Sequence, residues 1–223
     1  MTDVHSHILP GVDDGAASDE EAKALFAQYA QSGVDGVVCT PHQNRELRRG
    51  AQLREAFERL CEWAPKSMNL YLGAEIYAYE GMLDDLRSGE LLTLGESNYV
   101  LVEFSVHGGM MNIPDVVYEL SVGGYTPVVA HVERYGYLTR RDYEEIKDSG
   151  GLLQINARAF EHRSLAKLVK YLLKNNLLDF VASDCHDSKV RGVDFSAAKK
   201  YVQKKFPASF EKLFGDNAPF LKK

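Results

Sequence analysis

Short apolar runs alternate with amphipathic stretches along almost the whole chain, and this alternation constrains the fold more than any other sequence feature. The runs are nearly uniformly apolar, which is typical of strands buried on both faces. We expect strands at Asp3–His7, Gly36–Thr40, Leu70–Ile76, Tyr99–Phe104, Pro127–His131, Leu152–Asn156 and Phe180–Asp184. Strands separated by helices form parallel β-α units with right-handed crossovers. Seven units indicate a closed barrel slightly smaller than the eight-fold kind, with an open doubly wound sheet as the alternative.

The amphipathic stretches carry recognisable helix ends. Ser18 followed by Glu21 resembles a capping box, and Gly33 is a stop signal for that helix. Thr139 with Asp142 opens a second helix, which we expect to end at Gly150 and Gly151. Arg163–Asn175 carries leucine and valine residues at helical spacing.

Composition excludes several function classes. At 223 residues and without a linker or repeat, the chain is expected to form one domain spanning residues 1–223. The net charge of −6 argues against a nucleic-acid-binding surface. No apolar run approaches the roughly 20 residues that span a bilayer, and the N-terminus does not read as a secretory signal. The odd count of three cysteines fits reduced thiols in the cytoplasm.

Metal-binding residue types recur where the expected strands end. In parallel β-α barrels the carboxyl ends of the strands assemble the active site. Strand interiors are apolar here, so ionisable residues at the last positions need an explanation. The residues are His5, His7, His42, Glu75, Glu103, His131, Asp184 and His186. Each alone is weak evidence, but their joint occurrence at successive strand ends favours a metal site.

The spacing of these residues suits cation binding. Side chains alternate along a strand, so His5 and His7 share one face, and Asp184 and His186 repeat the pattern. The glutamates supply negative charge that can bridge two ions. Asp14 lies within reach of the same rim, with Asp13 as a near-equal alternative. Imidazole together with carboxylate suits manganese, iron or zinc.

These residues resemble the polymerase and histidinol phosphatase (PHP) superfamily, and most closely its bacterial manganese-dependent protein tyrosine phosphatases of capsule and exopolysaccharide loci. The matching segments are DVHSHILPGVDDG (3–15), CTPH (39–42), GAEI (73–76), VEF (102–104), AHVER (130–134), QIN (154–156) and SDCHDSKVRG (183–192). The resemblance implies a distorted (β/α)7 TIM-like barrel with a three-metal cluster, manganese being favoured.

The resemblance also assigns roles to single residues. It implies one ion held by His5, His7 and Asp184, with Glu75 bridging to a second. The second ion would take Glu75, Glu103 and His131, and the third would take Asp14, His42 and His186. Arg134 and Arg191 match the arginines that hold the substrate phosphate and stabilise the reacting group.

The function that the resemblance implies is hydrolysis of phosphotyrosine by metal-activated hydroxide. The expected partner is the phosphotyrosine-bearing tail of a bacterial tyrosine kinase from the same locus, so contact with a membrane would be only through this partner. The chain departs from common family patterns at Gln43, Val132 and Ala16, which affects loops rather than ligands. Two alternatives stay open: a phosphatase for a small monoester such as histidinol phosphate or a nucleotide, and a non-catalytic metal-stabilised binding barrel.

Two segments match the C-x5-R pattern of cysteine-based tyrosine phosphatases, namely Cys39–Arg45 and Cys185–Arg191. A nucleophilic thiolate needs a loop of free backbone N–H groups around the phosphate. Pro41 removes one such donor, and Asp187 would repel phosphate in the second segment. We interpret both matches as coincidence.

The C-terminal stretch Lys199–Lys223 is basic and amphipathic. We expect a last helix packed on the barrel with its lysines in solvent. Docking on a membrane surface or on a kinase tail is the alternative.

Overall fold

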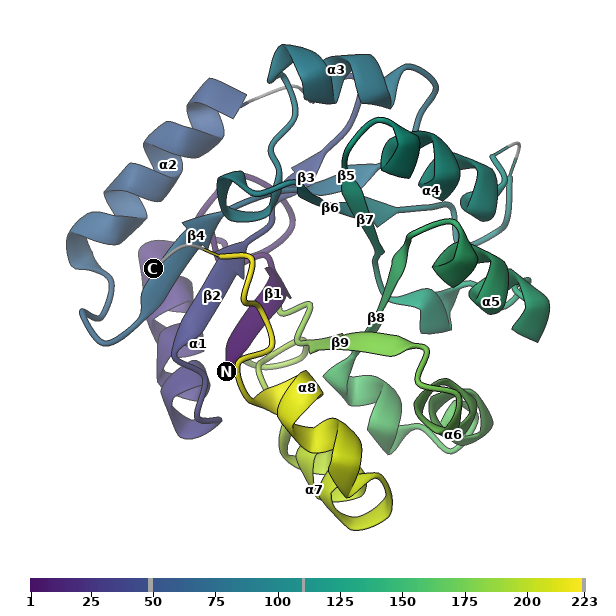
Figure 1. Cartoon of the computed structure of the whole chain (residues 1–223). Coiled ribbons are helices and arrows are strands. Elements are labelled where there is room, and N and C mark those ends of the chain that lie inside the picture. The colour runs from purple at the N-terminus through teal and green to yellow at the C-terminus, as the bar shows by residue number, and fades with distance from the viewer. Residues whose placement is uncertain (48–49, 110, 222–223) are drawn as a thin grey trace.

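A ring of strands surrounded by helices forms the fold (Figure 1). The computed structural model describes residues 1–47, 50–109 and 111–221. The strands are β1 (Thr2–Ser6), β2 (Gly36–Cys39), β3 (His42–Gln43), β4 (Asn69–Leu72), β5 (Glu75–Tyr77), β6 (Tyr99–Glu103), β7 (Thr126–Val129), β8 (Leu152–Asn156) and β9 (Leu178–Ala182). The α-helices are α1 (Asp19–Gln31), α2 (Gly50–Trp63), α3 (Met82–Ser88), α4 (Ile113–Val122), α5 (Arg140–Asp148), α6 (Ala166–Lys174), α7 (Ser196–Lys205) and α8 (Phe210–Phe214).

The strands are parallel and close into a distorted barrel with seven positions. They form two sheets, ordered β1-β2-β4 and β3-β5-β6-β7-β8-β9. Backbone hydrogen bonds continue across the break between the sheets, from Gly73 N to Cys39 O at 2.8 Å and from Glu75 N to Pro41 O at 3.1 Å. A parallel β-bridge between Ser6 and Cys185, with the backbone hydrogen bonds around it, joins the last strand position of the barrel, after β9, to the first, β1. The expectation of a closed barrel is confirmed, and the open doubly wound sheet is excluded.

The expected strand Leu70–Ile76 is wrong in one respect, because it consists of two strands in different sheets. β4 ends at Leu72, β5 begins at Glu75, and the chain bends between them at Gly73. A Cβ atom on Gly73 would lie 2.9 Å from Leu94 Cδ2 and 3.1 Å from Val38 Cγ1, so glycine permits this close packing. The run from Gly36 is interrupted in the same way, and it resumes as β3. These breaks distort the barrel.

The helix ends largely follow the sequence signals. The Ser18 side chain accepts a hydrogen bond from Glu21 N, and Thr139 and Asp142 form a reciprocal capping box. α6 begins at Ala166 rather than Arg163, because residues 163–165 form a turn in which Leu165 N donates to His162 O at 3.0 Å. Among the described residues, no helix combines the length and apolarity needed to cross a bilayer.

A second, smaller core fills the barrel below the polar residues. It contains inward side chains such as Val4, Leu101 and Phe180, and it is closed by the C-terminal segment through Ala218 and Leu221. In Figure 1 this yellow segment crosses the near end of the barrel toward β4. Such a seal leaves the opposite end, where the strands finish, as the open one.

The C-terminal stretch packs on the barrel, as expected, but as the two helices α7 and α8 rather than one. Lys199 Nζ and Lys212 Nζ donate hydrogen bonds to Ser32 O and Leu178 O, so not all of its lysines lie in solvent. Leu213 and Phe214 of α8 are buried, and α8 contacts β9. Tyr201, Phe206 and Phe210 are partly buried against the main core. Lys222 and Lys223, at the end of the basic stretch, lie outside the described residues.

Candidate metal centre

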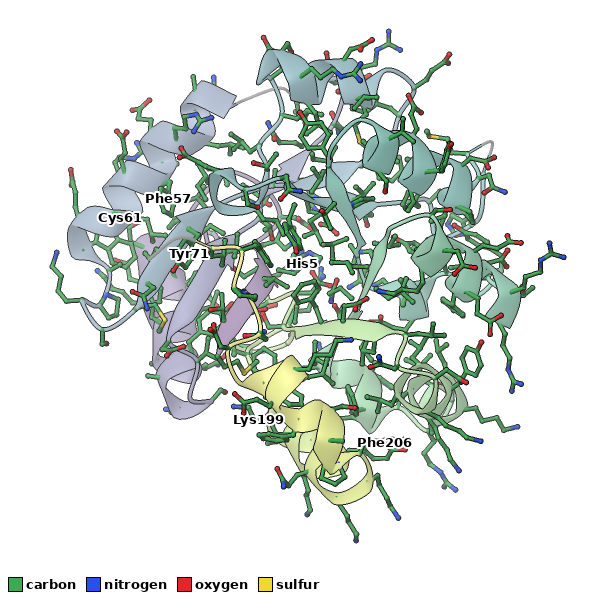
Figure 2. The ribbon with its side chains drawn as sticks, in the orientation of Figure 1. His5, Phe57, Cys61, Tyr71, Lys199 and Phe206 are labelled. Atoms are coloured by element: carbon green, nitrogen blue, oxygen red, sulfur yellow. The ribbon has the colours of Figure 1, made fainter. Side chains whose placement is uncertain are left out.

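The inward side chains change from apolar to polar toward the carboxyl ends of the strands. On β6 Leu101 is followed by Glu103 on the same face, and on the β9 side Phe180 and Ala182 are followed by Asp184. Figure 2 places His5 in the middle of the ring of strands. The barrel therefore holds a polar layer at its open end, supported by the apolar layer beneath it.

His5 and His7 face one another at the base of this layer. Their Nε2 atoms are 3.2 Å apart, and both side chains are fully buried. His7 Nε2 also lies 3.2 Å from a Glu75 oxygen, and His5 Nε2 lies 3.3 Å from the other. Burial alone lowers the pKa of His7, but its contacts with Asp13 and Glu75 outweigh this and raise the pKa to about 10.

Glu75 is the hub of the cluster. Besides the two strand histidines, it lies 2.8 Å from His131 Nε2 and 3.1 Å from His42 Nδ1. Burial would raise the pKa of Glu75, but the surrounding imidazoles hold it well below its usual range. Glu103 lies behind, 3.5 Å from His131 Nε2, and burial together with Glu75 raises its pKa to about 7.

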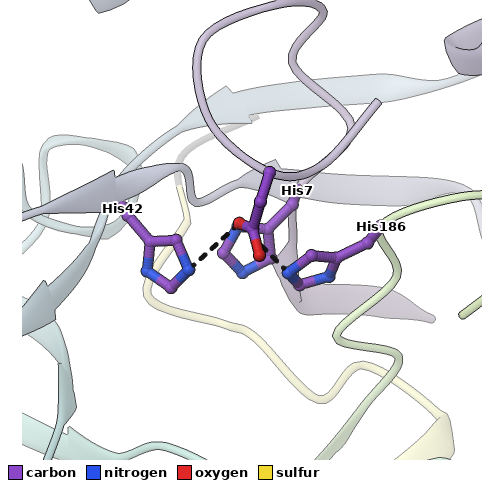
Figure 3. A group of neighbouring side chains, drawn as sticks. His7, His42 and His186 are labelled. Carbon is purple, nitrogen blue, oxygen red and sulfur yellow. Dashed lines mark ion pairs between the residues drawn. The ribbon is translucent and has the colours of Figure 1, made fainter. Parts of the chain in front are cut away.

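The mouth of the site is formed by Asp14, His42 and His186, and Figure 3 labels the two histidines together with His7. The dashed lines mark the contacts of Asp14 Oδ1 with His42 Nε2 at 3.3 Å and with His186 Nε2 at 3.5 Å. His7 lies between the two histidines, with its ring centroid 4.0 Å from that of His186. These three imidazoles come from three chain segments and point toward one carboxylate.

Asp13 and Asp14 occupy different places, although the sequence alone could not separate them. Asp14 is 64% exposed at the mouth, whereas Asp13 is 5% exposed and turned away from it. Asp13 Oδ2 accepts hydrogen bonds from His7 Nδ1 at 2.8 Å and from His42 N at 3.0 Å. Asp13 therefore supports two of the candidate ligands from behind.

Asp184 connects the imidazoles to two arginines. Its Oδ1 atom lies 3.5 Å from His5 Nε2 and 3.6 Å from His7 Nε2. Its Oδ2 atom accepts hydrogen bonds from the Arg134 guanidinium and, at 3.0 Å, from Arg191 Nη2. Both arginines are about one-third exposed, so each can still reach a ligand in solvent. Burial opposes ionisation of Asp184, but His5 and the other positive neighbours hold its pKa well below the usual range.

Two of these residues have an unusual backbone conformation. His131 and Asp184 have φ values of 31° and 52°, in the left-handed region that non-glycine residues seldom adopt. Such strain persists only where surrounding contacts enforce it, and it concentrates at functional sites. Both turns aim a side chain into the polar layer immediately after a strand.

The donor set fits divalent metal ions. Five imidazoles and four carboxylates converge, and groups of three or four of them offer ligand atoms within 4.8 Å of one another. Two buried Nε2 atoms at 3.2 Å need a cation or a shared proton between them. Buried carboxylates likewise require compensating positive charge. Nitrogen and oxygen donors in this mixture suit manganese, iron or zinc.

The sequence analysis assigned no supporting role to several residues of the site, although Gln154, Asn156 and Asp187 lie in segments that it quoted. Gln154 Oε1 accepts from His131 N at 2.7 Å and lies 3.1 Å from His5 Nδ1, while Asn156 Nδ2 donates to Asp184 at 2.8 Å. Both are buried polar residues at the end of an otherwise apolar strand. Asp187 accepts from three backbone N–H groups of the Arg191 loop, and Gln28 of α1 bonds to Ser188 O and Val193 N. Polarity inside a strand was the available signal for the first two.

The cysteines do not have the properties of a nucleophile. Cys39 and Cys185 are fully buried, and Cys61 is an exposed free thiol on α2 (Figure 2). Burial raises the pKa of Cys185 to about 12 and that of Cys39 well above its usual value. A reactive cysteine needs a lowered pKa. The interpretation of the two C-x5-R matches as coincidence agrees with this environment.

Comparison with known proteins identifies the family. A family model for capsular polysaccharide synthesis, CpsB/CapC, matches residues 1–221. The chain belongs to the CpsB/CapC family. Within it, the chain is 34% identical to the tyrosine-protein phosphatase CpsB of Streptococcus pneumoniae, covering 97% of this chain and 96% of that protein. It is 29% identical to the tyrosine-protein phosphatase YwqE of Bacillus subtilis, covering 99% and 91%.

Two solved structures resemble this chain. One, from a study of YwqE of Bacillus subtilis and CpsB of Streptococcus pneumoniae as unique metal-dependent tyrosine phosphatases, matches with a TM-score of 0.89 at 28% identity, covering 99% of this chain and 94% of the other. A histidinol phosphate phosphatase from Lactococcus lactis, solved with zinc, L-histidinol and phosphate, matches with a TM-score of 0.56 at 13% identity, covering 92% and 94%. The second likeness concerns the fold alone.

Proposed function

We propose that this protein is a metal-dependent protein tyrosine phosphatase that hydrolyses the phosphate monoester of phosphotyrosine. The observation that supports this most is the placement of two arginines on Asp184, at the edge of a buried histidine and carboxylate cluster. Such a site would surround a phosphate with positive charge, from the two arginines on one side and from metal ions held by the cluster on the other. The whole-length similarity to tyrosine phosphatases of the CpsB/CapC family supports the same activity.

The distances suggest how the cluster would hold three ions. His5, His7 and Asp184 would form one site, and Glu75 would bridge it to a second site with Glu103 and His131. Asp14, His42 and His186 would form the third site at the mouth, next to His7. We propose manganese as the ion, with iron or zinc also compatible with these ligands.

Bound ions of this kind supply a Lewis acid for phosphate oxygens and lower the pKa of water toward neutrality. The residues of the chain position the substrate. Arg134 and Arg191 would exchange part of their contact with Asp184 for the phosphate, whose geometry matches a guanidinium fork. Their charges would balance the charge that develops on the equatorial oxygens. Buried Asp184 keeps both guanidinium groups directed at one point.

A tyrosyl leaving group suits a site of this kind. A tyrosyl oxygen has a conjugate-acid pKa of about 10, so it departs with less protonation than a serine alkoxide requires. We propose that the partner is a phosphotyrosine-bearing protein, namely the tail of a tyrosine kinase acting in capsule synthesis, and that both meet in the cytoplasm. A flexible tail suits this site because its mouth residues, His42 and Asp14, are 30% and 64% exposed.

The test uses purified protein, metal analysis and a substrate panel. Manganese-loaded protein should hydrolyse a tyrosine-phosphorylated peptide, and protein stripped with EDTA should lose this activity and regain it with added manganese. Full activity in metal-stripped protein would contradict the proposal. A higher kcat/KM for histidinol phosphate or a nucleotide than for the phosphopeptide would instead favour the small-monoester alternative, and metal binding without turnover would favour a binding barrel.

A further inference from the structure

An apolar cavity lies at the rim of the barrel beside the metal centre. It has a volume of about 150 Å³, and its lining includes Tyr77, Ala78, Phe104 and Tyr137. Phe104 directly follows the candidate ligand Glu103, and Ala78 N donates a hydrogen bond to Glu103 O at 2.8 Å. The cavity therefore lies beside the strand ends that carry Glu75 and Glu103, and its lining contains none of the candidate ligands themselves.

Strand geometry places Tyr77 on the same face of β5 as Glu75, nearer the carboxyl end of the strand. Glu75 and Tyr77 are two residues apart on β5, so their side chains project from the same face of the strand. Two residues advance a strand by about 6–7 Å toward its carboxyl end. The Tyr77 side chain thus begins one layer of side chains nearer the open end of the barrel than that of Glu75.

Tyr137 forms another wall and is held in position. Its hydroxyl donates to Ser105 O at 3.0 Å, and its ring centroid lies 6.0 Å from that of Tyr135. The Tyr135 ring in turn lies 5.8 Å from the His131 ring. The Tyr135 ring therefore connects a candidate metal ligand, His131, with the Tyr137 wall of the cavity.

The distribution of exposed apolar side chains supports a binding role for this rim. Six large apolar side chains are exposed among the described residues, and three of them, Tyr77, Val106 and Tyr137, are each 42% exposed. Tyr77 ends β5, and the other two lie in the segments that follow β6 and β7 at the open end of the barrel. Exposed apolar groups that gather beside a polar site are typical of a ligand-binding surface. Arg134, to which the proposed function assigns phosphate binding, precedes Tyr137 by three residues.

We propose that this cavity, the aryl pocket formed by Tyr77, Phe104 and Tyr137, binds the phenyl ring of the phosphotyrosine substrate. This inference rests on the proposed function. It adds the residues of the protein that would distinguish an aryl phosphate from an alkyl phosphate. With the phosphate between Arg134, Arg191 and the cluster, the ester oxygen points outward, and the ring attached to it enters the layer of Tyr77. Aromatic rings there offer edge or face contacts that a serine or alkyl phosphate cannot make.

The test measures binding, so that the leaving-group ability of different esters does not enter. Calorimetry on manganese-loaded protein compares phenylphosphonate with methylphosphonate. Wild-type protein should bind the phenyl compound more tightly. The Tyr77→Ala and Tyr137→Ala substitutions should each reduce this preference by about three- to tenfold, the size expected for one aromatic contact. Affinity for methylphosphonate, metal content and thermal midpoint should stay unchanged.

Two control variants test whether the preference depends on an aromatic ring in this pocket. Tyr137→Phe keeps the ring and should retain the preference. Tyr118→Ala removes a tyrosine that is 62% exposed on α4, and it should also have no effect. Equal binding of both phosphonates by wild-type protein would overturn the aryl pocket while leaving the phosphatase proposal intact. A loss of phosphopeptide affinity without any change for phenylphosphonate would also overturn it, because the cavity would then hold a neighbouring residue of the peptide.

Discussion

His7 Nδ1 lies 2.8 Å from Asp13 Oδ2, and this contact directs the other ring nitrogen, Nε2, toward Glu75 and Asp184. A carboxylate behind a metal-binding imidazole fixes the tautomer and raises ligand basicity. Asp13 also accepts from His42 N, so it orients a residue of the mouth as well. Under the proposed function the two adjacent aspartates would have separate roles: Asp14 would bind an ion, and Asp13 would orient the histidines that do.

These roles predict different effects on metal content. Asp13→Ala should lower metal affinity by about 10- to 100-fold but leave the maximum number of bound ions unchanged. Asp14→Ala should reduce that number, because it removes a ligand of the mouth site. Metal analysis at saturating and at limiting manganese separates the two outcomes. A reduced maximum in the Asp13 variant alone would reverse the assignment.

Metal loading should release protons. The pKa of His7 is raised to about 10 without metal because the Asp13 and Glu75 contacts outweigh burial, so its Nε2 carries a proton near pH 7. A metal ion requires that nitrogen free, so binding expels the proton and affinity increases with pH. Calorimetric titration with manganese in buffers of different ionisation enthalpy measures the release. We expect weaker binding at pH 6 than at pH 8, and a heat independent of the buffer would contradict this.

The arginines should matter for turnover and not for metal content. Arg134→Ala or Arg191→Ala removes one cation that balances phosphate charge, and a loss of about 10²- to 10³-fold in kcat is expected for one such group. Lysine at either position should restore little, because an ammonium lacks the planar fork. Arg141→Ala is the matched control, since Arg141 is 82% exposed and pairs with Glu145 on the surface. Manganese content measured beside the rates shows whether the cluster remains intact.

The thiols should be dispensable. Cys39→Ala and Cys185→Ser replace the two residues that begin a C-x5-R segment, and both are buried with raised pKa values. Because activity is proposed to depend on metal, both variants should keep kcat within about threefold of wild type, a change of less than 1 kcal/mol. Loss of turnover in a folded, metal-loaded Cys185→Ser protein would instead indicate thiolate chemistry.

Much of the architecture could be predicted because strand ends and barrel ends coincide. Apolar runs located all seven barrel positions, and the polar residues after them met at one end. The break at Gly73 could not be predicted, because the residues on both sides are apolar and the bend depends on packing against Leu94 and Val38. Periodicity reports which face is buried, and it does not report which neighbour a strand pairs with.

The candidate site was predictable in its residue types and less so in its support. Histidines and carboxylates at strand ends stood out as exceptions in apolar sequence, whereas Gln154 and Asn156, although part of the quoted segment QIN, were given no role in the site. Asp13 and Asp14 could not be separated, since the turn of the loop decides which one faces His7. The residue types of the site could therefore be predicted from the sequence, whereas the directions of their side chains could be seen only in the structure.

Glu133 provides a prediction about stability. It is buried, one oxygen accepts from Asn156 N at 3.1 Å, and the other oxygen has no hydrogen-bond partner in the described part of the chain. Burial raises its pKa from 4.5 to about 7. The folded state therefore holds a proton that the unfolded state loses at lower pH, so the contribution of Glu133 to stability falls as pH rises from about 4.5 through about 7.

Glu133→Gln should remove this loss, because an amide is neutral at every pH. The thermal midpoint of the variant minus that of wild type should therefore increase between pH 5 and pH 8. An effect on the order of 2 kcal/mol corresponds to several degrees, at about 2–4 °C per kcal/mol for a chain of this size. Glu62→Gln, an exposed glutamate on α2, should give a flat difference over the same range. A flat difference for Glu133→Gln as well would mean that the buried carboxyl is ionised throughout, with a partner that the described contacts do not include.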